Sequence, residues 1–323
     1  MSSPLLRGPR WADVRVHRSA LRTGLGLVVL AAALTGLLRW ANHAYPEPTG
    51  PCTSDGSCET FLGFSSARAL LYEFLKDYSL GMLLIPVLIG AFVAGPVVAR
   101  EMESGTHKLA WTQSVSPVRW LTSKLTVFAV TSVAGGLALM AVFWAGRSGI
   151  GAVWNLNWAD RGVYESIGPV LVAYCLFAVM VGALAGLLVR RTLVALAAGG
   201  LVTGLVLLVM GNVRWQLFPV KTLSGPASGT STGYTMHDVP VDSLIIDMGV
   251  HNAAGERFVD RQCSPDQMAH FPCPSDTKVT GWYADIHPHS HFWYVQFIET
   301  GIILVLATAA AYAAFLVLRR RAA

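Results

Sequence analysis

Three histidines lie just before the last apolar segment of this 323-residue chain. His287, His289 and His291 carry imidazole nitrogens, which are common ligands of zinc and copper. Their spacing differs from the His-Glu-x-x-His pattern by which one helical face binds zinc. Pro288 also disfavours a continuous helix through the cluster. Two interpretations stay open, an outward-facing metal site and a polar segment that leads into the next helix.

A carboxyl group lies inside the apolar segment that follows. Glu299 falls within the run 297–318, and ionisable groups in membrane-spanning helices commonly mark a substrate path or proton relay. Glu299, with Phe292 and Trp293 before it, is therefore a candidate for a gate or path. The alternative is a structural role near the membrane surface, with hydrogen bonds to Trp293 or Tyr294.

No arrangement of residues predicts catalysis by this chain. No constellation of a nucleophile with its base is recognisable, and none of the lysines follows a glycine as the phosphate-binding Gly-Lys-[Ser/Thr] motif requires. We therefore predict that the chain is not an enzyme and holds no cofactor, and that any ATP hydrolysis takes place on another protein.

The composition indicates a membrane protein. Hydrophobic residues make up 53% of the chain, charged residues 13%, and the mean hydropathy is +0.50. Soluble domains carry about a quarter charged residues, so the composition argues against a soluble enzyme. A backbone in lipid must satisfy its own hydrogen bonds, so apolar runs of about 18 to 20 residues predict membrane-spanning helices. There are six such runs, at residues 23–38, 80–98, 125–144, 167–189, 192–210 and 297–318.

The distribution of charge predicts how these helices are oriented. Of the 24 Lys and Arg residues, 14 fall on the side that carries the amino terminus, with only three of the 19 acidic residues. Basic residues concentrate on the cytoplasmic side, so both termini are predicted to be cytoplasmic in a multi-pass protein of the cell membrane. The net charge of +5 then reflects topology and attraction to inner-leaflet lipid, and no nucleic-acid partner is expected.

The expected organisation follows from this topology. Arg39 directly follows the first apolar run with no cleavage site, so we expect that run to be retained as an anchor. The chain divides into a cytoplasmic amino terminus (1–22), helices one to five (23–210) with a cytoplasmic elbow (99–124), an extracellular loop (211–296), and the sixth helix with a basic tail (297–323). In the outer loops, residues 67–78 predict an amphipathic helix at the membrane surface, and the alternation of residues 239–250 predicts a short strand.

Four of the five cysteines fall in segments predicted to lie outside the cell. An oxidising exterior favours disulfides, and the simplest of three connectivities pairs Cys52 with Cys58 and Cys263 with Cys273. A metal site is less favoured because neither pair has Cys-x-x-Cys spacing. Cys175, in the fourth run, reads as a buried apolar side chain. The predicted fold is an all-α polytopic membrane protein of six helices with a disulfide-clamped loop between helices five and six.

The cytoplasmic elbow has its own local signals. Gly105 predicts the end of one helix, residues 109–113 allow about one helical turn, and Ser116-Pro117 combines an N-cap with proline at the first helical position. A short rigid connector of this kind can transmit a push from a cytosolic partner, or it can be a plain link held by lipid headgroups.

This elbow resembles the signature region of ABC-2-type permeases, the membrane subunits of ATP-binding-cassette exporters, in an actinobacterial-like form similar to the G-family or type V fold. The matching residues are Glu101-x-Glu103, Ser104-Gly105-Thr106, Leu109-Ala110-Trp111-Thr112-Gln113, Trp120-Leu121 and Lys124. The stretch Phe292-Trp293-x-x-Gln296-x-x-Glu299-x-Gly301 is similar to a second segment of such proteins. The outer loop at 211–296 matches nothing in the family.

The resemblance implies a mechanism and partners. Two permease copies, expected as a homodimer in membrane lipid, would each dock a cytosolic ATPase that binds ATP and magnesium. The elbow would act as the coupling helix. Its coupling residues would be Glu101, Glu103, Gly105, Thr106, Lys108 and Trp111.

The residue types also suggest a class of cargo and two competing functions. The apolar spans suit a hydrophobic or amphipathic compound such as a drug, lipid or peptide. Small residues at 182–186 and 199–204 are candidates for close helix contacts, either between moving parts or within one subunit. The alternatives are a self-contained membrane enzyme or metal-handling protein built on His287, His289 and His291, and a membrane sensor that uses its outer loop as a receptor.

Overall fold

The computed structural model describes residues 15, 18–45, 66–112, 116–148, 156–226, 239–259 and 279–322. They belong to two compact units. One comprises Met1–Val213 with Gln296–Ala323 and is helical, and the other, Arg214–Val295, contains a sheet.

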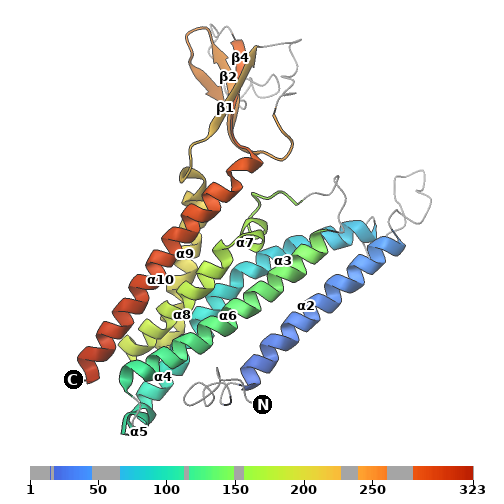
Figure 1. The fold of residues 1–323 in the computed structure, drawn as a ribbon. Coiled ribbons are helices and arrows are strands. Elements are labelled where there is room, and N and C mark those ends of the chain that lie inside the picture. Colours follow the sequence, from blue (N-terminus) through green and yellow to red (C-terminus); the bar gives the residue numbers. More distant parts are fainter. Residues whose placement is uncertain are drawn as a thin grey trace. The chain divides into compact units, whose positions relative to one another are not determined.

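Six helices in the described residues are long and apolar enough to cross a membrane, which confirms the prediction of a polytopic helical protein. The first is α2 (Arg18–Ala44), and the second runs from α3 (Ala67–Ile89) through the π-helical turn η2 (Gly90–Ala94) into α4 (Gly95–Glu103). The others are α6 (Pro117–Arg147), α8 (Val170–Val189), α9 (Thr192–Val213) and α10 (Phe292–Ala322). Two short helices, α5 (Thr106–Thr112) and α7 (Val163–Ile167), connect them (Figure 1).

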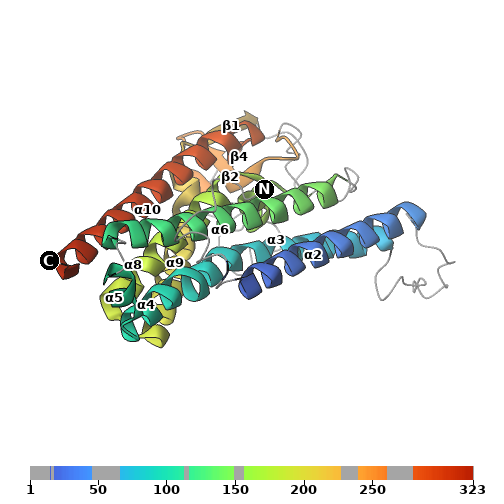
Figure 2. The same ribbon diagram turned by 60° about the horizontal axis from the view of Figure 1, so that its bottom comes forward.

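The apolar core of the helical unit surrounds α8. Most of this helix is buried, in contact with α3, α4, α6 and α9, as expected for a helix that is apolar on all sides. Buried residues of α4, α6, α8 and α10 meet in one cluster that includes Val98, Leu121, Val179 and Leu318. In contrast, α2 lies at the edge of this unit beside α3 and α6 and is almost entirely exposed (Figure 2).

Glycines allow the second spanning helix to approach α8 and α9 closely. A Cβ on Gly186 would lie 2.6 Å from the Gly95 carbonyl oxygen, and one on Gly90 would lie 2.8 Å from the Gly199 carbonyl oxygen. Backbones come this near only where side chains are absent. The small residues at 182–186 and 199–204 therefore make close helix contacts within one subunit. This was one of the two roles predicted for them.

The predicted surface helix at 67–78 is wrong. These residues form the first part of α3, which begins at the N-cap Ser66 and continues into the spanning helix without interruption. The apolar face that suggested a lipid contact packs inside the protein, because Leu71 and Leu75 are fully buried. Tyr78 stacks on Phe143 of α6 at 6.0 Å between ring centroids.

The segment before α8 is also more deeply buried than a surface loop. Residues 162–168 are buried, and α7 is closed at its start by the Glu165 carboxylate, which accepts a hydrogen bond from the Gly162 N–H at 2.7 Å. Gly162 has φ +84°, and a Cβ there would lie 2.5 Å from the Ser79 backbone. The break at Gly168-Pro169 starts α8 at Val170, three residues later than predicted.

The second unit contains a four-stranded antiparallel sheet, so the chain is not all-α. The strands β1 (Lys221–Pro226), β2 (Leu244–Asn252), β3 (Arg257–Val259) and β4 (Val279–His287) are arranged in the order β1-β4-β2-β3. The predicted strand at 239–250 corresponds in part to β2. The small core of the unit is formed by side chains of the inner strand β4, namely Trp282, Ala284 and Ile286.

The four cysteines that were predicted to form disulfides lie outside the described residues. They are Cys52, Cys58, Cys263 and Cys273. Cys175 is fully buried in α8 with a free thiol, in agreement with its interpretation as an apolar core residue.

Candidate functional site

The elbow between α4 and α6 is built from local turn signals that hold its short helix in place. The last turn of α4 closes with the Ser104 N–H donating to the Arg100 carbonyl at 2.9 Å, and Gly105 then adopts φ +74°. The left-handed conformation favours glycine. After α5, the Ser116 hydroxyl accepts a hydrogen bond from the Arg119 N–H at 3.3 Å and starts α6. Figure 1 shows α5 at the same end of the helical unit as the start of α2 and the end of α10.

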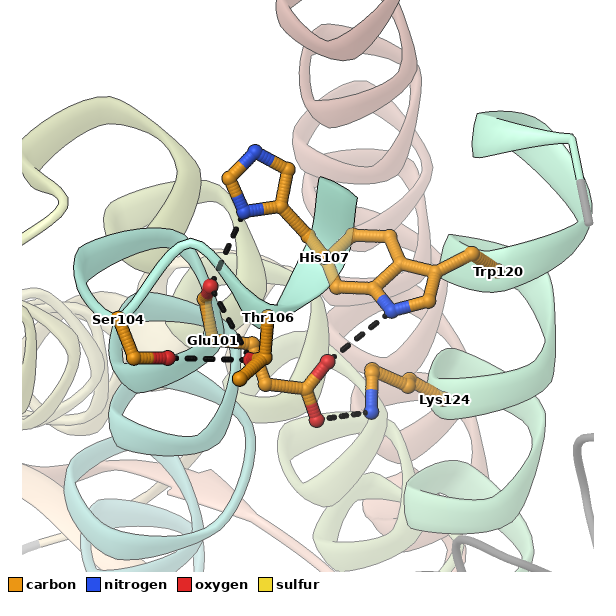
Figure 3. A network of polar contacts seen from close by, with 6 residues as sticks. All are labelled: Glu101, Ser104, Thr106, His107, Trp120 and Lys124. Atoms are coloured by element: carbon orange, nitrogen blue, oxygen red, sulfur yellow. Dashed lines mark hydrogen bonds and ion pairs between the residues drawn. The ribbon is translucent and has the colours of Figure 1, made fainter. Parts of the chain in front are cut away.

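The carboxylate of Glu101 joins the two helices that flank the elbow. One oxygen accepts a hydrogen bond from the Lys124 ammonium at 2.6 Å, and the other accepts one from the Trp120 indole N–H at 3.0 Å (Figure 3). The Lys124 side chain is only 3% exposed and the Glu101 side chain 30%. A buried ammonium requires a nearby anion, so Glu101 supplies the charge that allows Lys124 to remain inside the protein.

The backbone of Glu101 also holds α5. Its carbonyl oxygen accepts hydrogen bonds from His107 Nδ1 at 3.0 Å and from the Thr106 hydroxyl at 3.5 Å (Figure 3). The His107 ring meets the edge of Trp111 at 4.8 Å between centroids, and Trp111 in turn meets Trp120 at 6.3 Å. A single residue of α4 therefore contacts both α5 and α6.

Glu103, two residues further along, has a different partner. Its carboxylate accepts hydrogen bonds from the Thr192 N–H at 3.1 Å and the Thr192 hydroxyl at 2.7 Å. A carboxylate is stabilising at a helix N-terminus, and here it fixes the end of α4 to the beginning of α9. The two acidic residues of the elbow thus connect it to different helices.

The six residues expected to couple to an ATPase occupy different environments. Glu101 faces into the protein, Gly105 makes the turn and Trp111 is half-buried, whereas the side chains of Glu103, Thr106 and Lys108 are exposed. Sequence reasoning left His107, Trp120 and Lys124 out of this set. Trp120 and Lys124 belong to the stretch that resembles the family signature, but the contacts of these residues depend on how α4, α5 and α6 pack.

An open depression adjoins the elbow. Its volume is about 510 Å³, and its lining includes residues from α4, α5, the turn between α8 and α9, and the end of α10. The charged and aromatic groups in this lining are Glu103, His107, Lys108, Trp111, Arg190 and Arg321. The guanidinium of Arg321 donates hydrogen bonds to the carbonyl oxygens of Leu187 and Leu188.

Glu299 lies in the interior of the helical unit. It is fully buried, and one carboxylate oxygen accepts a hydrogen bond from the Tyr174 hydroxyl at 2.6 Å. One turn earlier, the Gln296 amide donates to the Tyr164 carbonyl at 2.7 Å and accepts from the Val170 N–H at 3.3 Å. These bonds attach α10 to α7 and α8. Glu299 therefore has a clear structural contact, and its role in a gate or path stays a prediction.

The other two gate candidates belong to the second unit. Phe292 is buried, Trp293 is 52% exposed, and their rings meet at 5.0 Å between centroids. The histidines there do not assemble into one site. His287 and His291 approach within 3.1 Å through their Nδ1 atoms, whereas the ring of His289 stacks on that of Phe292. Among the described residues, no three His, Cys, Asp or Glu side chains are grouped as metal ligands would be.

Burial lowers the pKa of two of these histidines, His287 and His291. The Nε2 atom of His287 lies 3.0 Å from the Trp215 carbonyl oxygen, and the residue is fully buried. Desolvation lowers the pKa of His287 below its ordinary value, although the hydrogen bond to Trp215 acts in the opposite direction. The neutral form is therefore favoured near pH 7.

The helical part of the chain matches a known family. A family model described as "ABC-2 membrane transporter related" matches residues 24–214, which include the elbow and five of the six spanning helices. Comparison with curated proteins and with solved structures gave no match.

Proposed function

The chain belongs to the ABC-2 membrane transporter related family, and on that basis we propose that its elbow transmits the work of a cytosolic ATPase to the spanning helices. Membership makes the chain a multi-pass permease component of an ABC transporter, and this family implies an ATPase partner. We infer export of a hydrophobic or amphipathic compound, with ATP and magnesium bound by the ATPase.

The bonds of Glu101 carry this proposal. Through its carboxylate and its carbonyl, this residue contacts α6 and α5 while it forms part of α4. A displacement of α5 would be passed directly to both flanking helices, because coupling requires packed or hydrogen-bonded elements rather than a loose loop. The exposed side chains of Thr106, Lys108 and Thr112 on α5 offer the surface that an ATPase would contact.

The glycine contacts lie where the displaced helix would move against its neighbours. Where α4 and η2 meet α8 and α9, the backbones touch at Gly90, Gly95, Gly186 and Gly199. Flat contacts of this kind let one helix shift against another with little side-chain interlocking. We propose that two copies of the chain pair in the membrane with cytoplasmic termini. Exposed apolar side chains of α9, among them Leu201 and Leu205, would then face lipid or the second copy.

The decisive experiment measures ATP turnover in the assembled transporter. The chain is co-expressed with ABC ATPases, beginning with any that is encoded by an adjacent gene, and the one that co-purifies is retained. Lys108→Glu reverses an exposed charge on α5 and is expected to weaken assembly or ATP turnover at least fivefold. Lys76→Glu is the matched control, since the Lys76 side chain is 52% exposed on α3, outside the elbow. Equal turnover in both variants would contradict the proposal.

A further inference from the structure

The depression beside the elbow has more positive than negative charge. Lys108 comes from α5, Arg190 from the turn between α8 and α9, and Arg321 from the end of α10. The carboxylate in the lining is that of Glu103, and its hydrogen bonds to Thr192 already engage it. Three cations from separate parts of the chain therefore converge on one hollow.

Arg190 occupies a position where glycine is the favoured residue. It ends α8 with φ 54°, the one positive φ among the described non-glycine residues, and its N–H donates to the Gly186 carbonyl at 3.1 Å. The helix end needs only the backbone of this residue. Within the ranges that the structure describes, no hydrogen bond or ion pair holds the side chain of Arg190 or of Lys108. Among the described residues, these two charges are therefore left for an anion from outside the chain.

The surroundings of Arg190 indicate its depth in the membrane. Leu188 is 50% exposed and Leu193 is 79% exposed, on either side of Arg190 in the chain. Exposed leucines at the ends of spanning helices belong among acyl chains, whereas arginine at a helix end extends toward the headgroups. The Trp111 ring in the lining also suits this boundary. From these residues we expect the depression to lie at the depth of the lipid phosphates.

We propose that the depression binds the phosphate group of an anionic glycerophospholipid. The Arg190 guanidinium and the Lys108 ammonium would hold phosphate oxygens, since arginine offers paired donors to phosphate and lysine a point charge. The acyl chains would lie along the exposed leucines. A hollow of about 510 Å³ falls within the size of ordinary ligand sites. Basic hollows between helices at the cytoplasmic face are known to select such lipids. This inference goes beyond the proposed function because it requires no ATPase.

The experiment uses the full chain purified in a neutral detergent and supplied with equal amounts of phosphatidylglycerol and phosphatidylcholine. Native mass spectrometry then counts the lipids that remain bound. We expect preferential retention of phosphatidylglycerol, and a loss of about fivefold in Arg190→Gln, as for removal of one cation near anionic lipid. Arg191→Gln is the matched control, because this neighbouring exposed arginine does not line the depression. It should retain the lipid within about twofold.

A second variant separates lipid binding from folding. Arg190→Gly removes the same charge but relieves the left-handed backbone, so it should lose phosphatidylglycerol while its unfolding temperature stays equal or rises. Equal retention of the two lipids, or equal losses in Arg190→Gln and Arg191→Gln, would overturn the proposal. So would competition by soluble glycerol phosphate at the same concentration as the lipid, which would show a site for free phosphate. The proposal would also fail if Arg190→Gln bound lipid normally but no longer co-purified with the ATPase. The depression would then be a site for a protein partner.

Discussion

Two carboxylates separated by one residue have different structural functions at the elbow. Glu101 neutralises the buried Lys124 on α6, whereas Glu103 caps α9 through Thr192. Their spacing places them about 200° apart around a helix, so one is expected to face inward when the other faces outward. The elbow therefore gains contacts on two sides from a short acidic motif.

The ion pair of Glu101 and Lys124 predicts an asymmetric response to mutation. Glu101→Gln leaves the Lys124 charge buried without its anion, so we expect the free energy of unfolding to fall by about 3 kcal/mol. The double variant Glu101→Gln with Lys124→Met removes the buried charge as well and should recover most of this loss. Chemical unfolding in detergent, monitored by tryptophan fluorescence, measures both.

The exposed pair of Glu73 and Lys76 serves as the control. Its two side chains are 43% and 52% exposed at 3.4 Å, so Glu73→Gln should change the free energy of unfolding by less than about 0.5 kcal/mol. If Glu101→Gln is as mild as Glu73→Gln, the pair does not hold the elbow.

Sequence reasoning located the elbow but not the direction of its side chains. Gly105, Ser116 and Pro117 mark helix ends by local chemistry, and local chemistry can be recognised in a sequence. Which carboxylate meets Lys124 depends on a contact across 23 residues, which is fixed only when α4 packs against α6. The sequence therefore indicated the segment but not the contacts of Glu101 with Trp120 and Lys124, and the coupling role of the six residues stays a prediction.

At the scale of elements, the spanning helices were predictable and the short buried ones were not. A helix that crosses the bilayer needs a long apolar run, and such runs stand out against polar connections. In contrast, α7 is only one turn long and contains Glu165, so its sequence resembles a loop. Its burial results from contacts with α3, including the close approach of Gly162 to Ser79.

The glycine contacts between helices predict that the stability of the helical unit falls steeply when a side chain is added at a contact. A Cβ on Gly199 would collide with the Gly90 carbonyl group, so Gly199→Ala should destabilise the helical unit by about 1–3 kcal/mol. A Cβ on Gly204 of the same helix would lie 3.9 Å from the nearest atom, on Val87. Gly204→Ala should therefore be neutral or slightly stabilising, because alanine favours helix. The unfolding midpoint in detergent distinguishes the two, and similar midpoints for both variants would contradict the close contact.

At the scale of the whole molecule, a helical permease unit and a small sheet unit rely on different forces. The helical unit is stabilised by close packing of long helices, whereas the sheet unit has a core of few side chains around Trp282. A small core leaves a small unit with little stability to spare. Alternation in the sequence indicated one strand near 239–250, but the pairing of β4 with both β1 and β2 depends on residues far apart in the chain.

The sheet unit is expected to lose stability in acid because of His287. Burial lowers the pKa of this histidine, so below its ordinary value of about 6.5 the unfolded chain binds a proton that the folded unit resists. Stability therefore rises with pH across this window and falls as the pH drops below it. Limited proteolysis of the full chain between pH 7.5 and pH 5 should show faster cleavage within Arg214–Val295 as the pH falls. In His287→Gln, whose amide can still donate to the Trp215 carbonyl, this pH dependence should be weaker while cleavage at pH 7.5 stays similar. An identical pH profile in both proteins would show that another group is responsible.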